Sequence, residues 1–353
     1  MKIIWRGSLF NPTGIATAYR EIVKELVKKG VEIQAEDIWH SGWEFNQGVE
    51  FLNKPIDAKN VDFTIFADYP HLWKNSYGKP IAYFLHEGTK LIDGWAQKFN
   101  LVPLVIVPSQ ATKNLFRVNG VASKIEIVPF GTNPQIYFPE QRENEDFIFL
   151  SVNSWTGNKG DRKGTDILIK AFDEEFKDEK VKLILKISTF WEKQPLEFYL
   201  KSIKNILGHD NPNILVNSDY LPEEELSKHY KKSDCFVMPT HGESFGLTAL
   251  NAVSCGLPII ITKDNNSGYM DFLRGKDSVL WIDAPKMEQA DRRFFMEGNL
   301  QPVPELESLK KQMRYAFEHK ELKEKAYINS EEFRKWSWEN SIIKLLKILN
   351  ENL

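Results

Sequence analysis

A strand, a polar turn, a helix rich in small residues and a second strand follow one another between residues 234 and 271. The apolar run Cys235–Met238 ends at a proline, and Gly246 comes directly before the helical stretch Leu247–Ser254. A second apolar run, Leu257–Thr262, completes a βαβ unit. Strands joined by such a crossover lie parallel in one sheet. The segment therefore predicts an α/β fold.

The turn between the first strand and the helix carries the chemistry of this unit. In open parallel sheets, ligands bind at the loops that follow the carboxyl ends of the strands. The helix begins near Phe245, and its free backbone N–H groups suit a phosphate. Glu243 comes just before them, where a carboxylate would repel a phosphate but would accept protons from sugar hydroxyls. These features indicate a nucleotide-sugar, and an ordinary βα turn with a capping acid is the alternative.

The rest of the chain also alternates apolar runs with helical segments. Most of the apolar runs are continuous, as expected for strands buried on both faces of a sheet, so we predict doubly wound parallel sheets. The expected strands in the first half are Lys2–Trp5, Val31–Ala35, Phe63–Ala67, Ile81–Leu85, Leu104–Val107 and Ile125–Val128. Those in the second half include Phe147–Val152, Val181–Ile187, Ile214–Val216 and Ser278–Ile282. The expected helices include Ile15–Lys29, Gln110–Val118, Ile167–Phe172, Leu309–Glu318 and Glu331–Leu349.

A polar run, residues 140–146, separates the two series of strands. The chain has 353 residues, enough for two domains. We therefore predict two Rossmann-like domains, residues 1–140 and residues 141–334.

The composition narrows the class of protein. Hydrophobic residues make up 42% and charged residues 27%, as in globular proteins, and the net charge of -3 does not indicate nucleic acid as the main partner. The cysteines, Cys235 and Cys255, lie in apolar segments and are expected to be buried thiols rather than a disulfide or metal site. No apolar run approaches the roughly 20 residues of a membrane span. We expect a cytoplasmic protein, with peripheral membrane contact left open.

The segment around Glu243 resembles the signature of the retaining GT-B glycosyltransferases of family 4, also called glycosyl transferases group 1. In that signature a Glu is followed by seven residues and a second Glu. Glu243 stands at the first position, and Asn251 stands at the second. The resemblance implies that Asn251 faces the nucleotide ribose. A neutral amide cannot form a charge-assisted hydrogen bond, which is commonly worth about 1–2 kcal/mol more than a neutral one. The residues assigned to the donor beside Glu243 are Ser244, Phe245, Gly246, Leu247 and Thr248.

A second motif of the same family matches at the start of the second domain. Residues 163–172 are similar to its Lys-Gly-x-Asp-x-Leu-Ile-x-Ala-Phe stretch, which implies that Lys163 binds the donor diphosphate. Family members also tend to have Gly-Arg after the preceding strand, where this chain has Asn153 and Ser154. Either Arg162 or Lys159 is the candidate for the second positive charge, and a solvated surface charge is the alternative for Arg162.

The first half resembles the family more weakly. His86 follows an expected strand, where family members often place a histidine near the reacting sugar; a structural histidine is the alternative. Gly14 lies between the first strand and the first helix, where backbone comes close to a ligand, but without the full dinucleotide fingerprint. Residues 336–339 resemble the family's late tryptophan segment, which implies that a helix at about 335–353 packs back on the first domain. The resemblance thus implies the GT-B architecture, with two domains facing a cleft.

The expected function is transfer of a hexose, with retention, from a nucleotide-sugar to a glycan, lipid-linked or protein-linked acceptor. Lys163, Arg162 and the backbone at 245–248 would stabilise the leaving diphosphate, so we expect no cofactor and no required metal. Glu243 would hold sugar hydroxyls and His86 would lie near the anomeric centre. Two alternatives stay open: a catalytically weak or inactive relative that binds sugar or nucleotide, and a nucleotide-sugar epimerase.

Overall fold

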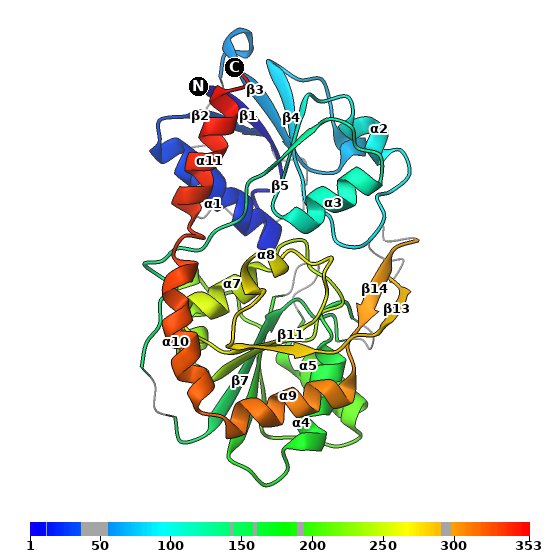
Figure 1. Ribbon diagram of the computed structural model, residues 1–353, viewed down its shortest axis with the longest axis vertical. Coiled ribbons are helices and arrows are strands. Elements are labelled where there is room, and N and C mark those ends of the chain that lie inside the picture. Colours follow the sequence, from blue (N-terminus) through cyan, green and yellow to red (C-terminus); the bar gives the residue numbers. More distant parts are fainter. Residues whose placement is uncertain (12, 37–55, 142–143, 158–160, 189–193, 291–297) are drawn as a thin grey trace. The chain divides into compact units, whose positions relative to one another are not determined.

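The computed structural model describes residues 1–353 except 12, 37–55, 142–143, 158–160, 189–193 and 291–297 (Figure 1). The chain divides into two compact units. Unit 1 comprises residues 1–131 and 336–353, and unit 2 comprises residues 132–335. Each unit is built on its own six-stranded sheet. The predicted α/β fold with two doubly wound parallel sheets is therefore confirmed.

The sheet of unit 1 has the strand order β2-β1-β3-β4-β5-β6, and all neighbouring strands are parallel. The inner strands β3 and β5 are short apolar runs that are buried along their whole length, whereas the edge strands β2 and β6 also carry charged residues. Burial on both faces explains why β3 and β5 do not alternate with polar residues. The strands are β1 Lys2–Gly7, β2 Glu32–Glu36, β3 Phe63–Ala67, β4 Lys79–Tyr83, β5 Leu104–Val107 and β6 Lys124–Ile127.

The helices of unit 1 include one from each end of the chain. Thr13 caps the first helix, because its Oγ1 accepts a hydrogen bond from Ala16 N at 3.1 Å. The last helix packs against the first, and Lys29 Nζ lies 2.8 Å from Glu339 Oε1. The helices are α1 Gly14–Lys28, α2 Trp95–Phe99, α3 Gln110–Val118 and α11 Trp338–Asn350, with short 3₁₀ turns at Ala58–Asn60 and Pro70–Leu72.

The sheet of unit 2 has the order β12-β11-β10-β7-β8-β9, again with parallel neighbours. The chain leaves β7 toward β8 and returns on its other side as β10, so the strand order reverses between β7 and β10. Ligands of doubly wound sheets bind at this reversal. The strands are β7 Phe147–Asn153, β8 Val181–Ile187, β9 Ile214–Asn217, β10 Cys235–Met238, β11 Ile259–Thr262 and β12 Val279–Ile282.

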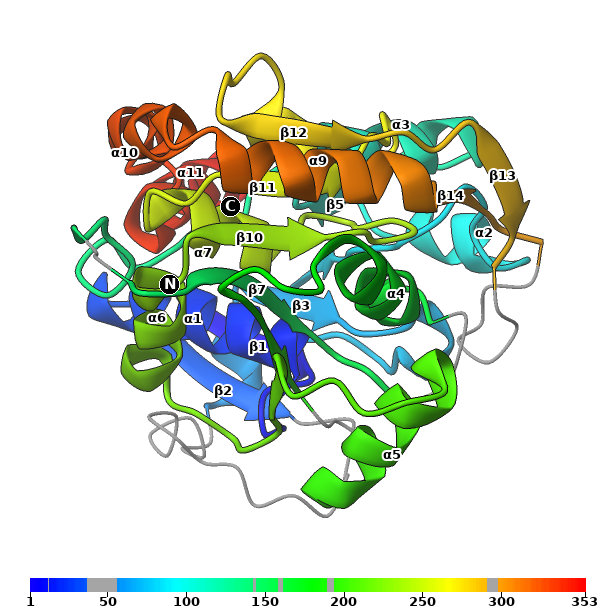
Figure 2. The same cartoon turned by 90° about the horizontal axis from the view of Figure 1, so that it is seen from below.

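Helices cover both faces of this sheet, as Figure 2 shows for β7 and β10 between the helices. On one face a core of buried side chains joins the sheet to α4, α5 and α9. The helices are α4 Thr165–Glu175, α5 Leu196–Leu207, α6 Glu223–Lys232, α7 Leu247–Ser254, α8 Met270–Leu273, α9 Leu306–Glu318 and α10 Glu321–Phe333. Two further strands, β13 Lys286–Gln289 and β14 Leu300–Val303, form a separate antiparallel hairpin. In the described part of the chain, no helix has the length and apolarity to cross a membrane.

Two features differ from the sequence-based expectations. The single helix expected at Glu331–Leu349 is wrong: α10 ends at Phe333, and Ser337 Oγ caps α11 by accepting from Asn340 N at 3.2 Å. The division between units lies at 131/132 rather than at 140/141. The connecting segment packs on unit 2, where the ring centres of Tyr137 and Tyr230 are 5.8 Å apart.

Candidate functional site

Two loops meet at the reversal of strand order in unit 2. One precedes α4 and carries Arg162 and Lys163, and the other joins β10 to α7. His241 N donates to the carbonyl oxygen of Arg162 at 2.8 Å, and Arg162 Nη1 donates to the carbonyl oxygen of Gly242 at 2.6 Å. The loops are thus joined to each other through both main chain and side chain.

The carboxylate of Glu243 gathers the positive charges of this site. Lys163 Nζ donates to Glu243 Oε1, Arg162 Nη1 lies 3.3 Å from the same oxygen, and Thr240 Oγ1 donates to it at 3.2 Å. The side chains of Glu243 and Lys163 are only 10% and 17% exposed. Burial by itself would raise the pKa of Glu243, but the charges and hydrogen bonds of its partners outweigh burial and lower it. The site therefore holds an ionised carboxylate against two cations.

The backbone of Glu243 is fixed by the turn that follows β11. Its N–H donates to Ser267 Oγ at 3.0 Å, and its carbonyl accepts from Gly268 N at 2.8 Å. Ser267 in turn donates to Asp264 Oδ2 at 2.7 Å. A Cβ at Gly268 would lie 2.1 Å from the carbonyl oxygen of Ser244, so only glycine permits this approach. The position of the carboxylate is set by its own main chain as well as by its partners.

Asp161 holds the loop that carries Lys163. Its Oδ1 accepts from Lys163 N at 2.6 Å and its Oδ2 from Thr165 N at 3.3 Å. The next residue, Gly164, has a φ of +67°, and a Cβ there would lie 2.0 Å from the carbonyl oxygen of Pro239. Burial, followed by the charge of Asp166, raises the pKa of Asp161 from its usual 3.8 to about 6. Asp161 was not identified from the sequence, although an Asp four residues before the first helical residue is a local signal for such a turn.

We expect Asp161 to make the stability of unit 2 depend on pH. A carboxyl whose pKa is higher in the folded state binds more protons there, so its contribution to stability falls as pH rises from about 4 to 6 and is constant above. In wild type the free energy of unfolding should fall on the order of 1–2 kcal/mol over this pH range. Asp161→Asn should abolish this fall, because the amide does not titrate. Urea denaturation of both proteins from pH 4.5 to 8 checks this. Parallel stability curves for the two proteins would contradict the assignment.

Helix α7 begins beside Glu243 without a side-chain cap, because its N-cap residue is Gly246, with a φ of +89°. The flanking side chains point into the protein: Phe245 is 1% exposed and packs on Phe272, and Thr248 Oγ1 contacts Met238 Sδ at 3.5 Å. Ser244 is buried, and Leu247 is half-buried. These residues offer a ligand their backbone rather than their side chains.

Asn251 lies in α7 and is 6% exposed. Its Oδ1 has no hydrogen-bond partner among the described residues. Burial raises the pKa of the Tyr230 hydroxyl, and the nearby amide of Asn251 lowers it in part. An unsatisfied buried acceptor is costly, so a hydroxyl donor placed there would be favoured.

The candidates for the second positive charge have different surroundings. Arg162 is not a solvated surface charge, because its side chain is 27% exposed and bonded to the other loop. Lys159 lies outside the described residues. Asn153 Nδ2 donates to the Ser151 hydroxyl at 3.0 Å, and its Oδ1 accepts from Thr165 Oγ1 at 3.4 Å. Both polar atoms of the amide therefore have partners within the protein.

His86 and Gly14 belong to unit 1. His86 follows β4 and is half-buried; its Nε2 lies 2.8 Å from the carbonyl oxygen of Lys90, and its ring packs edge-on against Trp95. Burial lowers the pKa of His86, and the contact with the Lys90 carbonyl offsets part of that shift. Gly14 is the first residue of α1, and a Cβ there would meet open space. No described residue of unit 1 therefore requires glycine at that position.

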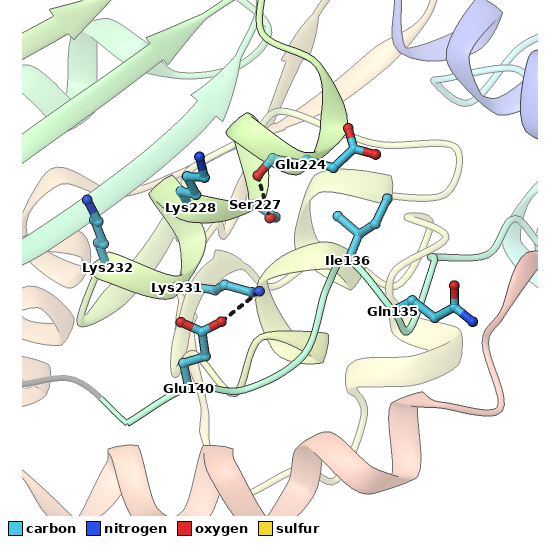
Figure 3. Close-up of a pocket in the computed structure, with 8 residues that line it drawn as sticks. All are labelled: Gln135, Ile136, Glu140, Glu224, Ser227, Lys228, Lys231 and Lys232. Carbon is cyan, nitrogen blue, oxygen red and sulfur yellow. Dashed lines mark hydrogen bonds and ion pairs between the residues drawn. The ribbon is translucent and has the colours of Figure 1, made fainter. Parts of the chain in front are cut away.

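A trough of about 320 Å³ lies between α6 and the segment 135–140 (Figure 3). Lys231 Nζ crosses it to bond Glu140 Oε1 at 2.8 Å. Figure 3 shows Lys228 and Lys232 pointing away from this pair. Because its charged groups do not converge, we assign no ligand to the trough. Among the described residues there is also no group of three His, Cys, Asp or Glu side chains placed to hold a metal ion.

Comparison with known proteins connects this geometry to a family. The model of the family "Glycosyl transferases group 1" matches residues 134–333, which include both loops of the site. A D-inositol 3-phosphate glycosyltransferase of Corynebacterium diphtheriae is 22% identical over 202 residues, which are 51% of this chain and 46% of that protein. An uncharacterized glycosyltransferase of Methanocaldococcus jannaschii is 24% identical over 332 residues, 92% of this chain and 78% of that protein. The chain thus spans less than half the length of the first of these relatives.

Solved structures with the same arrangement cover nearly the whole chain. A sucrose-phosphate synthase from Thermosynechococcus elongatus superposes with a TM-score of 0.73 at 14% identity, covering 100% of this chain and 99% of that one. HepE of Anabaena, in complex with UDP-glucose, superposes with a TM-score of 0.69 at 13% identity, covering 99% and 100%. At such identities the likeness shows the fold, which is that of GT-B proteins.

Proposed function

Because this chain belongs to the glycosyl transferases group 1, we propose that it transfers a hexose from a nucleoside-diphosphate sugar to a hydroxyl acceptor, with retention at the anomeric carbon. The observation that carries the proposal is the pairing of Lys163 and Arg162 with Glu243 at the reversal of strand order. Two cations and a carboxylate at one edge of a parallel sheet suit a ligand that bears both a diphosphate and sugar hydroxyls.

The cations serve the leaving group in this proposal. The bond between the anomeric carbon and the diphosphate oxygen breaks, and negative charge grows on the diphosphate. Lys163, Arg162 and the backbone N–H groups at the start of α7 stabilise that charge, so no required metal is proposed. A new bond forms between the anomeric carbon and the acceptor oxygen, and the acceptor proton passes to the leaving phosphate. The transfer written in this way therefore needs no protein nucleophile.

Glu243 changes partners when the donor binds. In its absence the carboxylate is held by Lys163, Arg162 and Thr240. A diphosphate competes for the same cations, and the carboxylate is then available to sugar hydroxyls. After the exchange the cations are paired with the diphosphate and the carboxylate accepts hydrogen bonds from the hydroxyls, so it is not left without partners in a site where Glu243 is only 10% exposed.

The remaining assignments complete the proposal. We also propose roles for two residues of unit 1, His86 toward the reacting sugar and Gly14 toward the donor. HepE, a structure neighbour, is in complex with UDP-glucose, which supports a nucleoside-diphosphate hexose as donor. The acceptor is a glycan or another hydroxyl compound carried on a lipid or protein.

One experiment separates this function from the alternative of a catalytically inactive relative. That alternative is supported by Asn153 and Asn251, where the chain departs from the family motifs. A thermal-shift screen of nucleoside diphosphates and their hexoses identifies the base and sugar. Incubation with the best donor and a panel of acceptors should release free nucleoside diphosphate, and NMR of the product should show the anomeric configuration of the donor. Binding without release would indicate the inactive relative, and an inverted product would exclude retention.

Asn251 provides a test of the nucleotide end of the site. Asn251→Ala should weaken nucleoside-diphosphate binding by about 1 kcal/mol, roughly fivefold, if its unpaired Oδ1 accepts a ribose hydroxyl. Asn251→Glu should tighten binding by a similar factor only if the buried position admits the longer side chain beside Tyr230. Calorimetric titration measures both. Unchanged affinity in both variants would make Asn251 a packing residue.

A further inference from the structure

The β13–β14 hairpin has no counterpart among the elements expected from the sequence. Its strands pair Met287 with Pro302 and Glu288 with Gln301, and Gln301 Nε2 donates to Glu288 Oε1 at 3.2 Å. All of β13 is exposed, whereas Gln301 and Pro302 are buried. Figure 1 shows the hairpin to one side of the six-stranded sheet. One strand of the hairpin is therefore packed on unit 2 and the other is open to solvent.

The imidazole of His241 contacts this hairpin. It is 9% exposed, and its Nδ1 lies 3.8 Å from Glu288 Oε1. The backbone of Pro302 also raises the pKa of His241, as an acceptor of an imidazole N–H does; proline has no N–H of its own to donate.

The main chain at His241 reaches the cations of the donor site. His241 N donates to the Arg162 carbonyl at 2.8 Å, and the Arg162 guanidinium donates to the Gly242 carbonyl at 2.6 Å and lies 3.3 Å from Glu243. Gly242 has a φ of +142°, a conformation that side chains rarely adopt, so the turn gains little stiffness from its own backbone. The contact of the His241 imidazole with the hairpin therefore restrains this turn where the glycine does not.

We propose that His241 is a positioning residue of the donor site and that the β13–β14 hairpin holds it in place. The hairpin lies against the imidazole of His241, the backbone N–H of His241 donates to the Arg162 carbonyl, and the guanidinium of Arg162 lies beside Glu243. The inference rests on the proposed function, because it assigns the cations to a donor. His241 acts through Arg162 and needs no contact with the donor itself.

Two substitutions at His241 test positioning against folding. His241→Gln keeps an N–H that can reach the Pro302 carbonyl, and His241→Ala does not. We expect His241→Ala to weaken nucleoside-diphosphate binding and raise the KM for the donor on the order of tenfold, and His241→Gln to stay within about threefold of wild type. His209→Ala, at a histidine of the same unit that is 57% exposed, is the matched control.

The outcomes separate this inference from the proposed function. Wild type that binds no nucleoside diphosphate overturns the donor site as a whole. If wild type binds but His241→Ala matches it, the positioning role is wrong. If Ala and Gln lose affinity equally and in step with their melting temperatures, the role is structural only.

Glu288→Gln gives a second test that leaves the core untouched, because Glu288 is 52% exposed and Gln can still accept from Gln301. Burial lowers the pKa of His241, Glu288 and Asp166 raise it, and Arg162 lowers it. Neutralising Glu288 should therefore shift the His241-dependent step in the pH profile of donor binding, from pH 5 to 8, toward lower pH than in wild type. Superimposable profiles would contradict the coupling between hairpin and donor site.

Discussion

Lys163→Ala should reduce kcat/KM for transfer by about 10²–10³-fold, the loss typical of a group that stabilises a leaving charge. The variant should also be less stable by about 2 kcal/mol, because it leaves Glu243, only 10% exposed, with fewer positive neighbours. Loss of activity alone would therefore not distinguish a binding role from a folding role. Lys177→Ala, an exposed lysine of the same unit, is the control.

The double variant Lys163→Ala/Glu243→Gln resolves the two roles. It removes both charges of the pair, so most of the lost stability should return, whereas binding of the bare nucleoside diphosphate should stay as weak as in Lys163→Ala. Chemical denaturation and calorimetric titration of the same preparations provide the comparison. Recovery of nucleotide binding together with stability would show that Lys163 only neutralises Glu243.

Glu243→Gln should have opposite effects on turnover and on binding of the bare nucleotide. Transfer should fall by at least about 10²-fold, because an amide holds sugar hydroxyls less strongly than a carboxylate. A nucleoside diphosphate without sugar should bind about fivefold more tightly, a gain of about 1 kcal/mol, since it no longer competes with a carboxylate for Lys163 and Arg162.

Calorimetry with the nucleoside diphosphate and with its hexose measures this contrast directly. Glu224→Gln, an exposed acid of α6, serves as control. Equal weakening for both ligands would place Glu243 on the nucleotide rather than on the sugar.

The elements that the sequence predicted best are those whose side chains are mostly buried. The runs Leu104–Val107, Val181–Ile187 and Cys235–Met238 form strands with these same bounds, and Leu247–Ser254 forms the expected helix. Short, mostly apolar runs are typical of strands inside a parallel sheet. The family resemblance was confirmed by the family model, which spans both motifs.

The parts that were missed depend on contacts distant in sequence. Each strand of the β13–β14 hairpin has four residues, and β14 contains Pro302, so neither carries a periodicity that indicates a strand. Periodicity also says nothing about which side chains meet across a site. The bond from Lys163 to Glu243 joins residues 80 positions apart, and only the fold brings them together. The roles of Glu243, Lys163 and His86 toward a ligand stay predictions.

The contribution of α11 to unit 1 has a consequence for biosynthesis. Trp338 packs on Phe130 with ring centres 6.0 Å apart, and a Cβ at Gly131 would lie 2.3 Å from the backbone at residues 337–338. The helix follows residues 132–335 in the sequence, so during synthesis residues 1–131 gain the cover of α11 over Phe130 and α1 only after all of unit 2 has been made. We therefore expect unit 1 to complete its fold late, although its strands are synthesised before those of unit 2.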